Sequence, residues 1–429
     1  MRIAYLTARY PFPPIGGDRM RVYYTLRHLL RSHEVTLYAL APAPGAEWQS
    51  GHPALPGLRQ KIFQMDKPSY AWNGATALFS GLPLQVKLYK CSELMQTLDS
   101  DIRSGTVDLL FVHLIRMAEY ARPYHDIPRI LDMADSIYQN YARMRRIWWR
   151  PLWVGARMDR SRVRRYEAEV PRWFDNVLIH TEEDLEWVRK QSGATNLTQS
   201  QMGVDTDEFS FQNGPHDPRR IVYCGKLDTL PNADAALYFA KQIFPLVRRR
   251  LPEAQFSVVG LNPPRSVRAL ARLPGVEVRA NVPDIRTEMA SAGVSVSPVR
   301  FGAGIQNKIL QSLAMGIPVV ATGFAAKPFG EATDSPLLAA DSPQEFADQV
   351  IRILEEPEFR RRLALEGRKL IEARFQWDQV LKPLDGILNG FEAKQTQGIA
   401  RQSSKREICP DCKSNPEIGL NSKDGMITD

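Results

Sequence analysis

Apolar and polar residues follow one another in blocks that predict alternating strands and helices. Residues 2–8 form a short apolar run that ends in a loop rich in Pro and Gly. Residues 19–32 then carry apolar side chains at helical spacing, and residues 33–42 form a second apolar run. Strand, helix and strand in this order predict a βαβ unit at the start of the chain.

Later runs are apolar throughout rather than at every second position, which is typical of buried parallel strands. In the first half of the chain they lie at 107–113, 129–135 and 176–184, and all three end in polar residues. A second series predicts strands at 220–227, 254–261, 276–282, 293–299 and 317–322, and helices at 232–252, 283–292, 307–316 and within 342–375. Two such series predict an α/β protein with two Rossmann-like, doubly wound domains that face each other across a cleft.

A change in composition at residues 209–219, which are rich in Gly, Pro, Asn and charge, predicts a linker. We therefore expect an N-terminal domain over 1–208 and a C-terminal domain over 220–375. Residues 376–392 are expected to form a helix that packs back toward the N-terminal domain. The polar residues 393–429 are expected to form a disordered tail.

The chain has 429 residues, of which 44% are hydrophobic and 24% charged, as suits two globular domains. Its net charge of +8 fits anionic small molecules, anionic lipid or nucleic acid, and does not choose among them. Four cysteines are too few for a disulfide framework, so we expect a reducing cytoplasm. No run reaches the roughly 18 apolar residues of a spanning helix, so a membrane would be met from one side.

The C-terminal motif "CPDC", with Cys409 and Cys412, is similar to half of a zinc site. Tetrahedral zinc sites need four ligands, and no second pair stands nearby. We therefore predict no metal site.

The stretch "FGAGIQNKILQSLAMG" predicts a helix N-terminus that faces the cleft. Gly304 allows a close backbone approach, and the amides from Ile305 to Lys308 would be donors without intrahelical acceptors, which attract phosphate. Lys308 opposes the helix dipole, a placement that makes more sense if an anion binds there. The alternative is that Gln306 and Asn307 only cap and solvate the helix start.

Two further loops carry similar chemistry. Gly16 and Gly17 precede the first helix, and Lys226 follows a strand at the start of the second domain, with Asn232 leading into the next helix. The glycine spacing does not match a dinucleotide-binding fingerprint, so a Rossmann dehydrogenase is not supported. Three strand-end loops with glycine or lysine, from two domains, favour one phosphate-binding cleft over three ordinary solvated loops.

These motifs carry a resemblance to a known family. The segment "SPVRFGAGIQNKILQSLAMGIPVVAT", with "YCGKL", "FSVVGL" and "PPIGGDRMR", resembles retaining glycosyltransferases of GT-B fold, a group that includes sucrose synthases and bacterial mannosyltransferases. Together with "LDTLPNADA" it is similar to a narrower branch of sugar transferases associated with bacterial exopolysaccharide synthesis. The resemblance covers about residues 1–390, and its C-terminal motifs are the more specific ones.

The resemblance implies a nucleotide-diphosphate sugar bound mostly to the second domain and an acceptor bound to the first. The implied donor-binding residues are Gly16, Gly17, Lys226, Asn232, Val282, Gly304, Ile305, Gln306, Asn307, Lys308 and Gln311. Of these, Val282 falls where the family reads the base through its backbone, and Gln311 where it has a glutamate that holds the ribose. The family's first glutamate is replaced by Ala303, so this chain lacks both signature carboxylates. Either Gln306, Asn307 and Lys308 substitute for them or the protein is catalytically weak.

A nucleoside diphosphate leaving group needs positive charge fixed in advance, which helix-end amides with Lys226 and Lys308 would supply without a metal. A base for the acceptor hydroxyl would come from strand ends of the first domain, where His113 and the pair Asp132 and Asp135 lie. Each of the three has a structural role as its alternative. The candidate catalytic residues are Asp135, His113, Lys226 and Lys308.

A basic and aromatic segment follows residue 140. It contains Arg145, Arg146, Trp148, Trp149, Arg150 and Trp153. This composition suits the headgroup layer of an anionic membrane. The alternatives are a helix packed on its own domain through the tryptophans, and nucleic acid, for which no recognised module is present.

The sequence therefore predicts a cytoplasmic enzyme, peripheral on the inner face of the membrane, of the hexosyltransferase type. It would move a sugar with retention from a nucleotide-diphosphate donor to a lipid-linked or polysaccharide acceptor in exopolysaccharide biosynthesis, with no cofactor, metal or nucleic acid. The main rival is a catalytically inactive nucleotide-sugar-binding or scaffold protein of the same fold. A second rival is an epimerase, which would need no acceptor.

Overall fold

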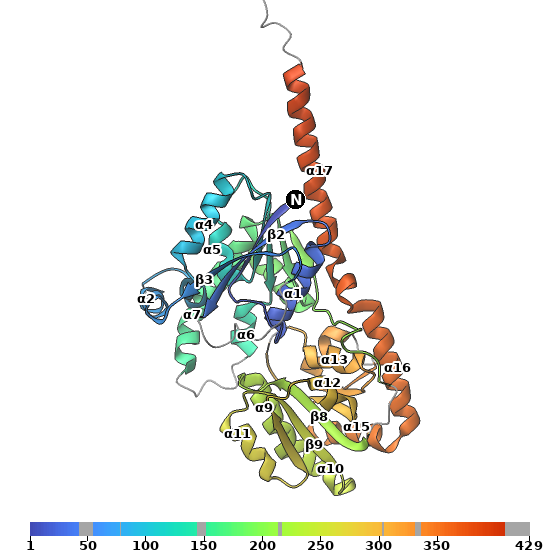
Figure 1. Ribbon diagram of the computed structural model, residues 1–429. Coiled ribbons are helices and arrows are strands. Elements are labelled where there is room, and N and C mark those ends of the chain that lie inside the picture. The colour runs from blue at the N-terminus through green and yellow to red at the C-terminus, as the bar shows by residue number, and fades with distance from the viewer. Residues whose placement is uncertain are drawn as a thin grey trace, which may run out of the picture. The chain divides into compact units, whose positions relative to one another are not determined.

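The computed structural model describes residues 1–42, 55–77, 79–143, 152–212, 217–302, 304–330 and 336–407. Within them the chain forms two wholly parallel sheets whose strands alternate with helices, which confirms the predicted fold class. Figure 1 shows each sheet flanked by helices, the first in blue to green and the second in yellow-green to orange.

The first sheet has seven strands in the order β3-β2-β1-β4-β5-β6-β7. Its strands are β1 (Arg2–Thr7), β2 (Glu34–Pro42), β3 (Arg59–Met65), β4 (Leu109–His113), β5 (Arg129–Ala134), β6 (Asn176–Ile179) and β7 (Leu197–Gln199). Its helices are α1 (Gly17–Leu29), α2 (Lys67–Ala77), α3 (Leu84–Leu88), α4 (Ser92–Arg103), η1 (Ile115–Met117), α5 (Ala118–Ala121), α6 (Ile137–Arg143), α7 (Leu152–Glu169), η3 (Val170–Trp173) and α8 (Glu182–Ser192).

The second sheet has six strands in the order β10-β9-β8-β11-β12-β13. Its strands are β8 (Asp217–Lys226), β9 (Gln255–Leu261), β10 (Val276–Ala280), β11 (Ala292–Ser297), β12 (Val319–Ala321) and β13 (Leu337–Ala339). Its helices are α9 (Leu230–Tyr238), η4 (Phe239–Ile243), α10 (Phe244–Arg250), α11 (Arg265–Arg268), η5 (Ala269–Arg272), α12 (Ile285–Ala290), α13 (Asn307–Ala314), α14 (Gly323–Ala326), η6 (Lys327–Phe329), α15 (Pro343–Glu355) and α16 (Pro357–Arg374).

Two predicted elements differ in their details. The single helix expected at 232–252 is instead two α-helical segments joined by a π-helical turn, η4. Pro245, in the first turn of α10, lacks the amide that would continue the α-helical ladder, which accounts for the break. Strand β8 begins at Asp217, inside the predicted linker 209–219.

The last helix, α17 (Trp377–Glu407), extends beyond the predicted end at residue 392. Residues 393–407 continue this helix, because they contain no proline and are rich in Ala, Lys, Gln, Arg and Glu, which favour helices. The disordered tail stays a prediction. The chain divides into two compact units, Met1–Leu384 and Asp385–Asp429. Cys409 and Cys412 lie outside the described residues.

Within the first unit, the start of α17 contacts the first domain. Trp377 stacks on Tyr24 with ring centroids 4.6 Å apart, and Arg31 pairs with Asp378 at 2.8 Å. Ser200 Oγ donates to the carbonyl of Val380 at 3.1 Å. The domain boundaries themselves stay predictions.

The cores of both sheets are formed by the apolar runs. Every residue of β4, β5 and β11 is buried, which explains why these strands lack the alternation of a half-exposed sheet. Since all strands of a sheet are parallel, their carboxyl ends share one edge, and the polar residues that follow them are gathered there.

Candidate functional site

The candidate site is built from loops at the carboxyl ends of strands in both sheets. In the first domain, Gly16 and Gly17 follow β1, while Asp135 follows β5. In the second domain, Lys226 ends β8, and the loop after β11 leads through Gly304 into α13. Described contacts connect the two sets of loops.

Two glycines face the opposite domain at close range. A Cβ atom at Gly17 would lie 3.4 Å from Asn307 Nδ2, and the same nitrogen is 3.6 Å from Met20 Sδ on α1. A Cβ atom at Gly304, whose φ is 59°, would lie 2.7 Å from Asp135 Oδ1. Only glycine fits this conformation and this approach without displacement. The predicted convergence of loops from the two domains is therefore present.

The start of α13 is not capped by its own side chains. Gln306 is the N-cap residue with extended backbone, but its side chain makes no capping hydrogen bond. Gln306 Oε1 instead accepts from Lys308 Nζ at 3.0 Å. The amide of Ile309 donates to the carbonyl of Gln306 at 2.9 Å, while the amides that precede it in the first turn have no acceptor further back in the helix, so this end of the helix attracts anions. This arrangement disfavours the alternative in which Gln306 merely caps the helix.

Lys308 is a buried cation with neutral partners. Its residue is 8% exposed, and Nζ donates to Asn232 Oδ1 at 3.0 Å and lies 5.3 Å from the Tyr223 ring centroid. No carboxylate lies within ion-pair distance of it among the residues that the structure describes. Burial lowers the pKa of Lys308 to about 8. A bound anion would stabilise the charged form and raise this pKa again, so the site is suited to a phosphate group.

Asn232 joins the two lysines of the site. Its Oδ1 accepts from Lys308 Nζ, and its Nδ2 donates to the carbonyl of Lys226 at 2.9 Å. The Lys226 side chain is 49% exposed, and its Nζ lies 3.8 Å from Asp228 Oδ2. Lys226 is therefore at the same edge as Lys308, and its side chain pairs with an exposed carboxylate.

Asp132, near the carboxyl end of β5, is the centre of a buried charged cluster in the first domain. Its Oδ2 pairs with Arg21 Nε at 2.9 Å and with His113 Nδ1 at 3.3 Å, and its Oδ1 lies 3.6 Å from His180 Nε2. Burial acts to raise the pKa of Asp132, but Arg21 and the two histidines outweigh it and hold the pKa well below its usual value. His113 is only 1% exposed, so the structure places it behind Asp132.

Asp135 is the more accessible carboxylate of the predicted pair. Its side chain is 26% exposed, lies against Gly304, and has Oδ1 3.9 Å from His180 Nδ1. Burial raises the pKa of Asp135 above its usual value. His180 was missed by the sequence analysis, although it follows β6 directly, as His113 ends β4 and Asp135 follows β5.

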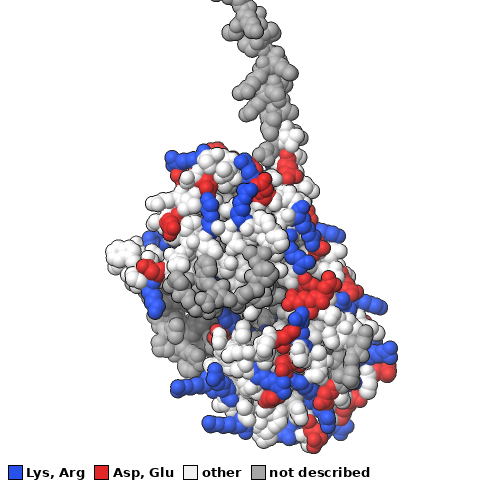
Figure 2. Space-filling model, in the orientation of Figure 1, with Lys and Arg blue, Asp and Glu red and all other residues white. Residues whose placement is uncertain are grey.

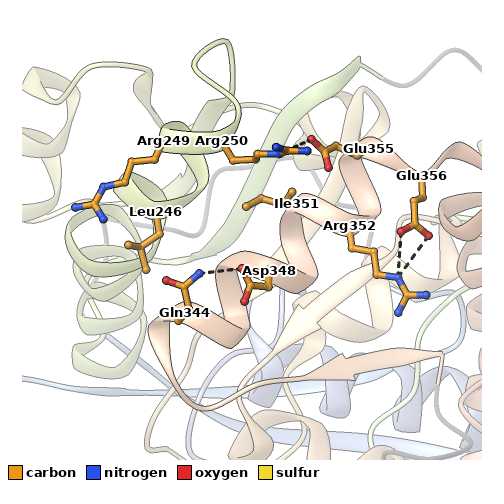
Figure 3. A pocket seen from close by; sticks show the side chains of 9 residues that line it. All are labelled: Leu246, Arg249, Arg250, Gln344, Asp348, Ile351, Arg352, Glu355 and Glu356. Atoms are coloured by element: carbon orange, nitrogen blue, oxygen red, sulfur yellow. Dashed lines mark hydrogen bonds and ion pairs between the residues drawn. The ribbon is translucent and has the colours of Figure 1, made fainter.

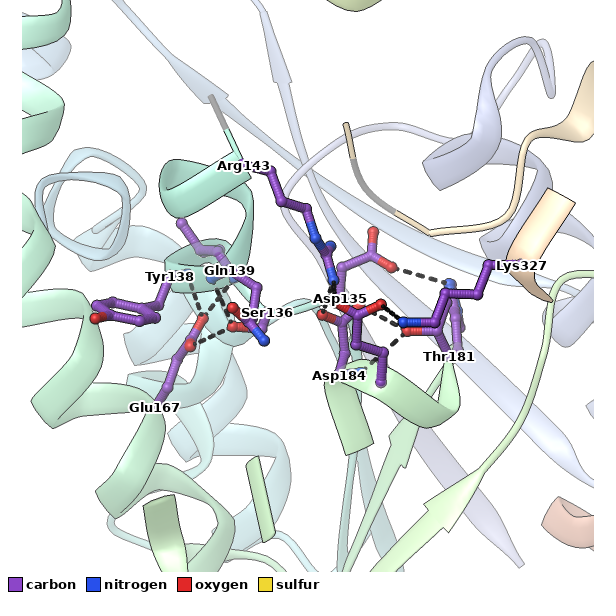
Figure 4. A network of polar contacts seen from close by, with 12 residues as sticks. Asp135, Ser136, Tyr138, Gln139, Arg143, Glu167, Thr181, Asp184 and Lys327 are labelled. Carbon is purple, nitrogen blue, oxygen red and sulfur yellow. Dashed lines mark hydrogen bonds and ion pairs between the residues drawn. The ribbon is translucent and has the colours of Figure 1, made fainter. Parts of the chain in front are cut away.

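Figure 4 shows how the segment after Asp135 is fixed. Glu167 on α7 is buried, and its carboxylate accepts from Ser136 Oγ at 2.8 Å and from the amide of Ile137 at 2.6 Å. It therefore caps the start of α6 from another helix. Burial raises the pKa of Glu167 to about 8.

A second part of this network crosses between the domains. Glu183, on α8, accepts from Arg143 Nη2 at 2.9 Å and from Lys327 Nζ at 2.7 Å. Arg143 also lies 3.3 Å from Asp184 Oδ1. Lys327 belongs to the second domain, so these charges hold it against the first.

The remaining predicted donor residues lie on the second domain. Val282 follows β10 and is half-buried, and Ile305 is buried beside Gly304. Gln311 is 8% exposed on α13, and no side-chain hydrogen bond is found for it within the described ranges. Ala303 lies outside the described residues.

Most of the predicted membrane segment lies outside the residues that the structure describes. Residues 144–151, which contain Arg145, Arg146, Trp148, Trp149 and Arg150, lie outside the described residues, as does the side chain of Trp153 on α7. None of the described helices is long and apolar enough to cross a bilayer. The described residues contain no group of three or more metal-binding side chains.

A separate surface pocket lies on the second domain between α10 and α15 (Figure 3). Four of its charged side chains pair with one another, Arg250 with Glu355 at 3.1 Å and Arg352 with Glu356 at 3.4 Å. Helix α10 ends just before β9 begins, so this pocket is at the sheet edge opposite Lys308. On the face drawn in Figure 2, described charges of both signs are mixed, without a broad area of one sign.

Comparisons with known proteins agree with this architecture. Residues 218–356 match the family model described as "Glycosyl transferases group 1". Sucrose-phosphate synthase from Thermosynechococcus elongatus superposes with a TM-score of 0.68 at 16% identity, over 92% of this chain and 99% of that one. The chain has the GT-B fold, and residues 218–356, within its second domain, are similar to the group 1 glycosyl transferases.

Other GT-B structures are similar over most of their length. HepE from Anabaena, solved with UDP and glucose, has a TM-score of 0.62 at 12% identity, over 91% of this chain and 100% of that one. WaaG, a glycosyltransferase involved in lipopolysaccharide biosynthesis, has a TM-score of 0.61 at 15% identity, over 89% and 98%. No curated protein sequence matches the chain. The resemblance is confirmed for its fold and its second domain, while the exopolysaccharide branch stays a prediction.

Proposed function

We propose that this protein is a retaining glycosyltransferase that moves a hexose from a nucleotide-diphosphate donor to a lipid-linked or polysaccharide acceptor, without a metal. The observation that carries the proposal is Lys308, a buried cation with only neutral partners, at a helix N-terminus that faces loops of the other domain. HepE, which has the same fold, was solved with UDP, in agreement with this kind of donor.

The chemistry follows from the charges at this edge. When the bond from the sugar to the diphosphate breaks, negative charge develops on the leaving oxygen. First-turn amides of α13 and Lys308 would meet this charge as donors already held in place by Asn232 and Gln306. Donors that are fixed in advance need no reorganisation during the reaction, and this preorganisation usually contributes more to catalysis than any other effect.

The acceptor hydroxyl must lose its proton when the new bond forms. Asp135 is the group best placed to receive that proton, because it is accessible, adjoins Gly304 and has a raised pKa. His180 and Asp132 lie behind it and would keep it oriented. His113 then acts through Asp132 rather than on the acceptor.

Release of nucleoside diphosphate from a panel of UDP- and GDP-sugars, with membrane extract as acceptor source, tests the proposal. Release that depends on the acceptor and is lost in Asp135→Asn would support it. Gln311, a neutral residue where the family has a glutamate, favours the rival binding protein. Donor binding without turnover on any acceptor would establish that rival, and isomerised donor without acceptor would establish an epimerase.

We also propose that residues 145–153 bind the inner face of an anionic membrane. The support is their composition, three tryptophans among arginines, which suits a headgroup layer. Replacing Trp148 and Trp149 by serine should release the protein from vesicles that contain anionic phospholipid. Unchanged vesicle binding would contradict this role.

A further inference from the structure

A group of arginines and tyrosines lies beside the candidate site, in the first domain. We call it the Tyr89 cluster, and it consists of Arg9, Tyr70, Tyr89, Arg116 and Tyr141. Arg9 lies in the loop after β1, Arg116 in η1 after β4, and Tyr141 on α6 after β5. Tyr89 follows α3 and meets Tyr70 edge to face, with ring centroids 6.2 Å apart. The cluster is therefore at the same sheet edge as Asp135.

Within this cluster, Arg116 is the residue whose surroundings indicate a bound ligand. It is half-buried, its guanidinium carbon lies 5.2 Å from the Tyr89 ring centroid, and Nη1 donates to Tyr89 Oη at 3.4 Å. Its Nε is buried and has no hydrogen-bond partner among the described residues, and no described carboxylate pairs with it. A cation removed from water without an anionic partner is costly, so the protein gains if an anion binds there.

Arg9 extends the positive charge toward the two-domain site. Its pKa is raised, because Asp18 and the Tyr89 hydroxyl together outweigh burial, the largest single effect, which acts in the opposite direction. Arg9 Nη1 pairs with Asp18 Oδ2 at 2.7 Å. Asp18 is next to the glycine loop, since a Cβ atom at Gly16 would lie 3.6 Å from its Oδ1. The cluster thus borders the loop whose Gly17 faces Asn307.

We propose that the Tyr89 cluster binds the acceptor, with Arg116 and Arg9 on a phosphate group and Tyr89 against the adjoining sugar ring. The inference rests on the proposed function, and it names the chemistry of the acceptor as a phosphosugar. Guanidinium groups form paired, charge-assisted hydrogen bonds with phosphate, and a tyrosine ring provides a rigid apolar face with a polar edge. A phosphosugar bound here would lie along the edge that carries Asp135.

Binding of glucose 1-phosphate to the full-length protein tests the proposal. Saturating UDP, or GDP if UDP does not bind, is present in every titration, so that the donor site is occupied and any further phosphate binding is measured separately. Calorimetry compares glucose 1-phosphate, inorganic phosphate and uncharged methyl glucoside. Glucose 1-phosphate should bind more tightly than inorganic phosphate, and methyl glucoside should not bind. If glucose 1-phosphate and inorganic phosphate bind with equal affinity, the proposed contact between Tyr89 and the sugar ring is wrong.

Two matched variants locate the binding. Arg116→Gln should weaken glucose 1-phosphate about tenfold or more, because it removes charge-assisted hydrogen bonds. The control is Arg122→Gln, since Arg122 is also stacked on an aromatic ring of this domain, 4.5 Å from the Trp173 centroid, but pairs with Glu119. Equal affinities in the two variants would overturn the proposal. Thermal unfolding of both variants checks that a loss of affinity is not a loss of fold.

A further experiment distinguishes binding of a sugar phosphate from binding of a lipid headgroup. Vesicles that contain phosphatidic acid are sedimented with the wild type and with Arg116→Gln. If Arg116→Gln lowers vesicle binding and leaves glucose 1-phosphate binding unchanged, the phosphate belongs to a headgroup and the proposal is wrong. If neither UDP nor GDP binds the wild type, the proposed function fails. If UDP binds and Arg116 has no effect, only the acceptor inference fails.

Discussion

Replacing Lys308 by methionine should make the protein more stable and at the same time remove donor binding. Methionine has nearly the length of the lysine side chain and no charge, so it fills the same space beside Tyr223. In the wild type, a cation is held in a site that is 8% exposed and offers it only amide oxygens. The cost of that charge is compensated only when an anion is bound.

The magnitude follows from the pKa. Burial lowers the pKa of Lys308 from 10.5 to about 8. A difference of about 2.5 pKa units corresponds to about 3 kcal/mol at 1.36 kcal/mol per unit. The amide oxygens of Asn232 and Gln306 lose a donor in the variant, but both residues are only half-buried and water can replace it. We therefore expect Lys308→Met to gain about 1–3 kcal/mol in the free energy of unfolding at pH 7.

The same shift fixes the pH dependence. The folded-state pKa of Lys308 lies below the unfolded-state value, so between about pH 8 and pH 10.5 the unfolded chain holds a proton that the folded chain has released. Below pH 8 the buried charge of Lys308 therefore destabilises the folded protein by its full amount. The free energy of unfolding then rises as the pH increases from about 8 to 10.5. Lys308→Met should lack this rise.

Two measurements test the reasoning. Urea unfolding at pH 7 and pH 9.5 gives the difference in stability between the wild type and Lys308→Met. Calorimetry of UDP binding at pH 8, in two buffers of different ionisation enthalpy, should show uptake of up to about half a proton by the wild type, as the anion restores the charge of Lys308. A variant that is less stable than the wild type at pH 7, or that binds UDP with unchanged affinity, would refute the account of this site.

Three further predictions concern the segments around the site. Gly304→Ala should lower turnover by about a hundredfold, measured as diphosphate release, because the new methyl group displaces Asp135. Burial raises the pKa of Glu167 to about 8, so the thermal midpoint should fall as the pH rises from about 4.5 to 8, and Glu167→Gln should remove that part of the fall. Asp132→Asn leaves the buried Arg21 unpaired and should cost about 3–5 kcal/mol in urea unfolding.

Two of these predictions have a control variant elsewhere in the chain. Gly81→Ala adds a methyl group where no atom lies within 4 Å and should leave turnover unchanged. Asp108→Asn removes an ion pair with Arg2, whose side chain is 44% exposed, and should cost far less than Asp132→Asn. Equal costs for the two aspartates would show that burial of the Arg21 pair is not what matters. A pH profile of Glu167→Gln identical to that of the wild type would assign the fall to other groups.

The positions of most strands along the chain could be predicted from the sequence because the apolar runs of a buried parallel sheet are continuous. β4, β5 and β11 each stand out in this way. The strands that the sequence did not predict, β3, β7 and β13, are all edge strands, two of them only three residues long, and their burial is partial. Short, half-exposed strands have little periodicity to detect, so only their partners reveal them.

The residues of the candidate site also differ in whether a local pattern in the sequence could predict them. Gly304 and Lys308 could be predicted because a local pattern, a glycine before a helix start, has a local physical meaning. His180 could not be ranked above other polar residues that follow strands, because its role depends on Asp132 and Asp135, which are more than 40 positions away in the chain. Tyr89, the partner of Arg116, is likewise distant, 27 positions away in the chain.

The contrast between Asp132 and Asp135 shows why proximity in sequence does not decide function. Both belong to one short motif, yet their strand register turns Asp132 inward, against Arg21, and leaves Asp135 facing the second domain. The inward carboxylate is held ionised by a buried arginine, while the outward one has its pKa raised by burial without a full counter-charge. A group held permanently ionised is suited to orienting its neighbours, and a group with a raised pKa is suited to accepting a proton. Asp135→Asn should therefore remove turnover and spare stability, and Asp132→Asn should lower stability first.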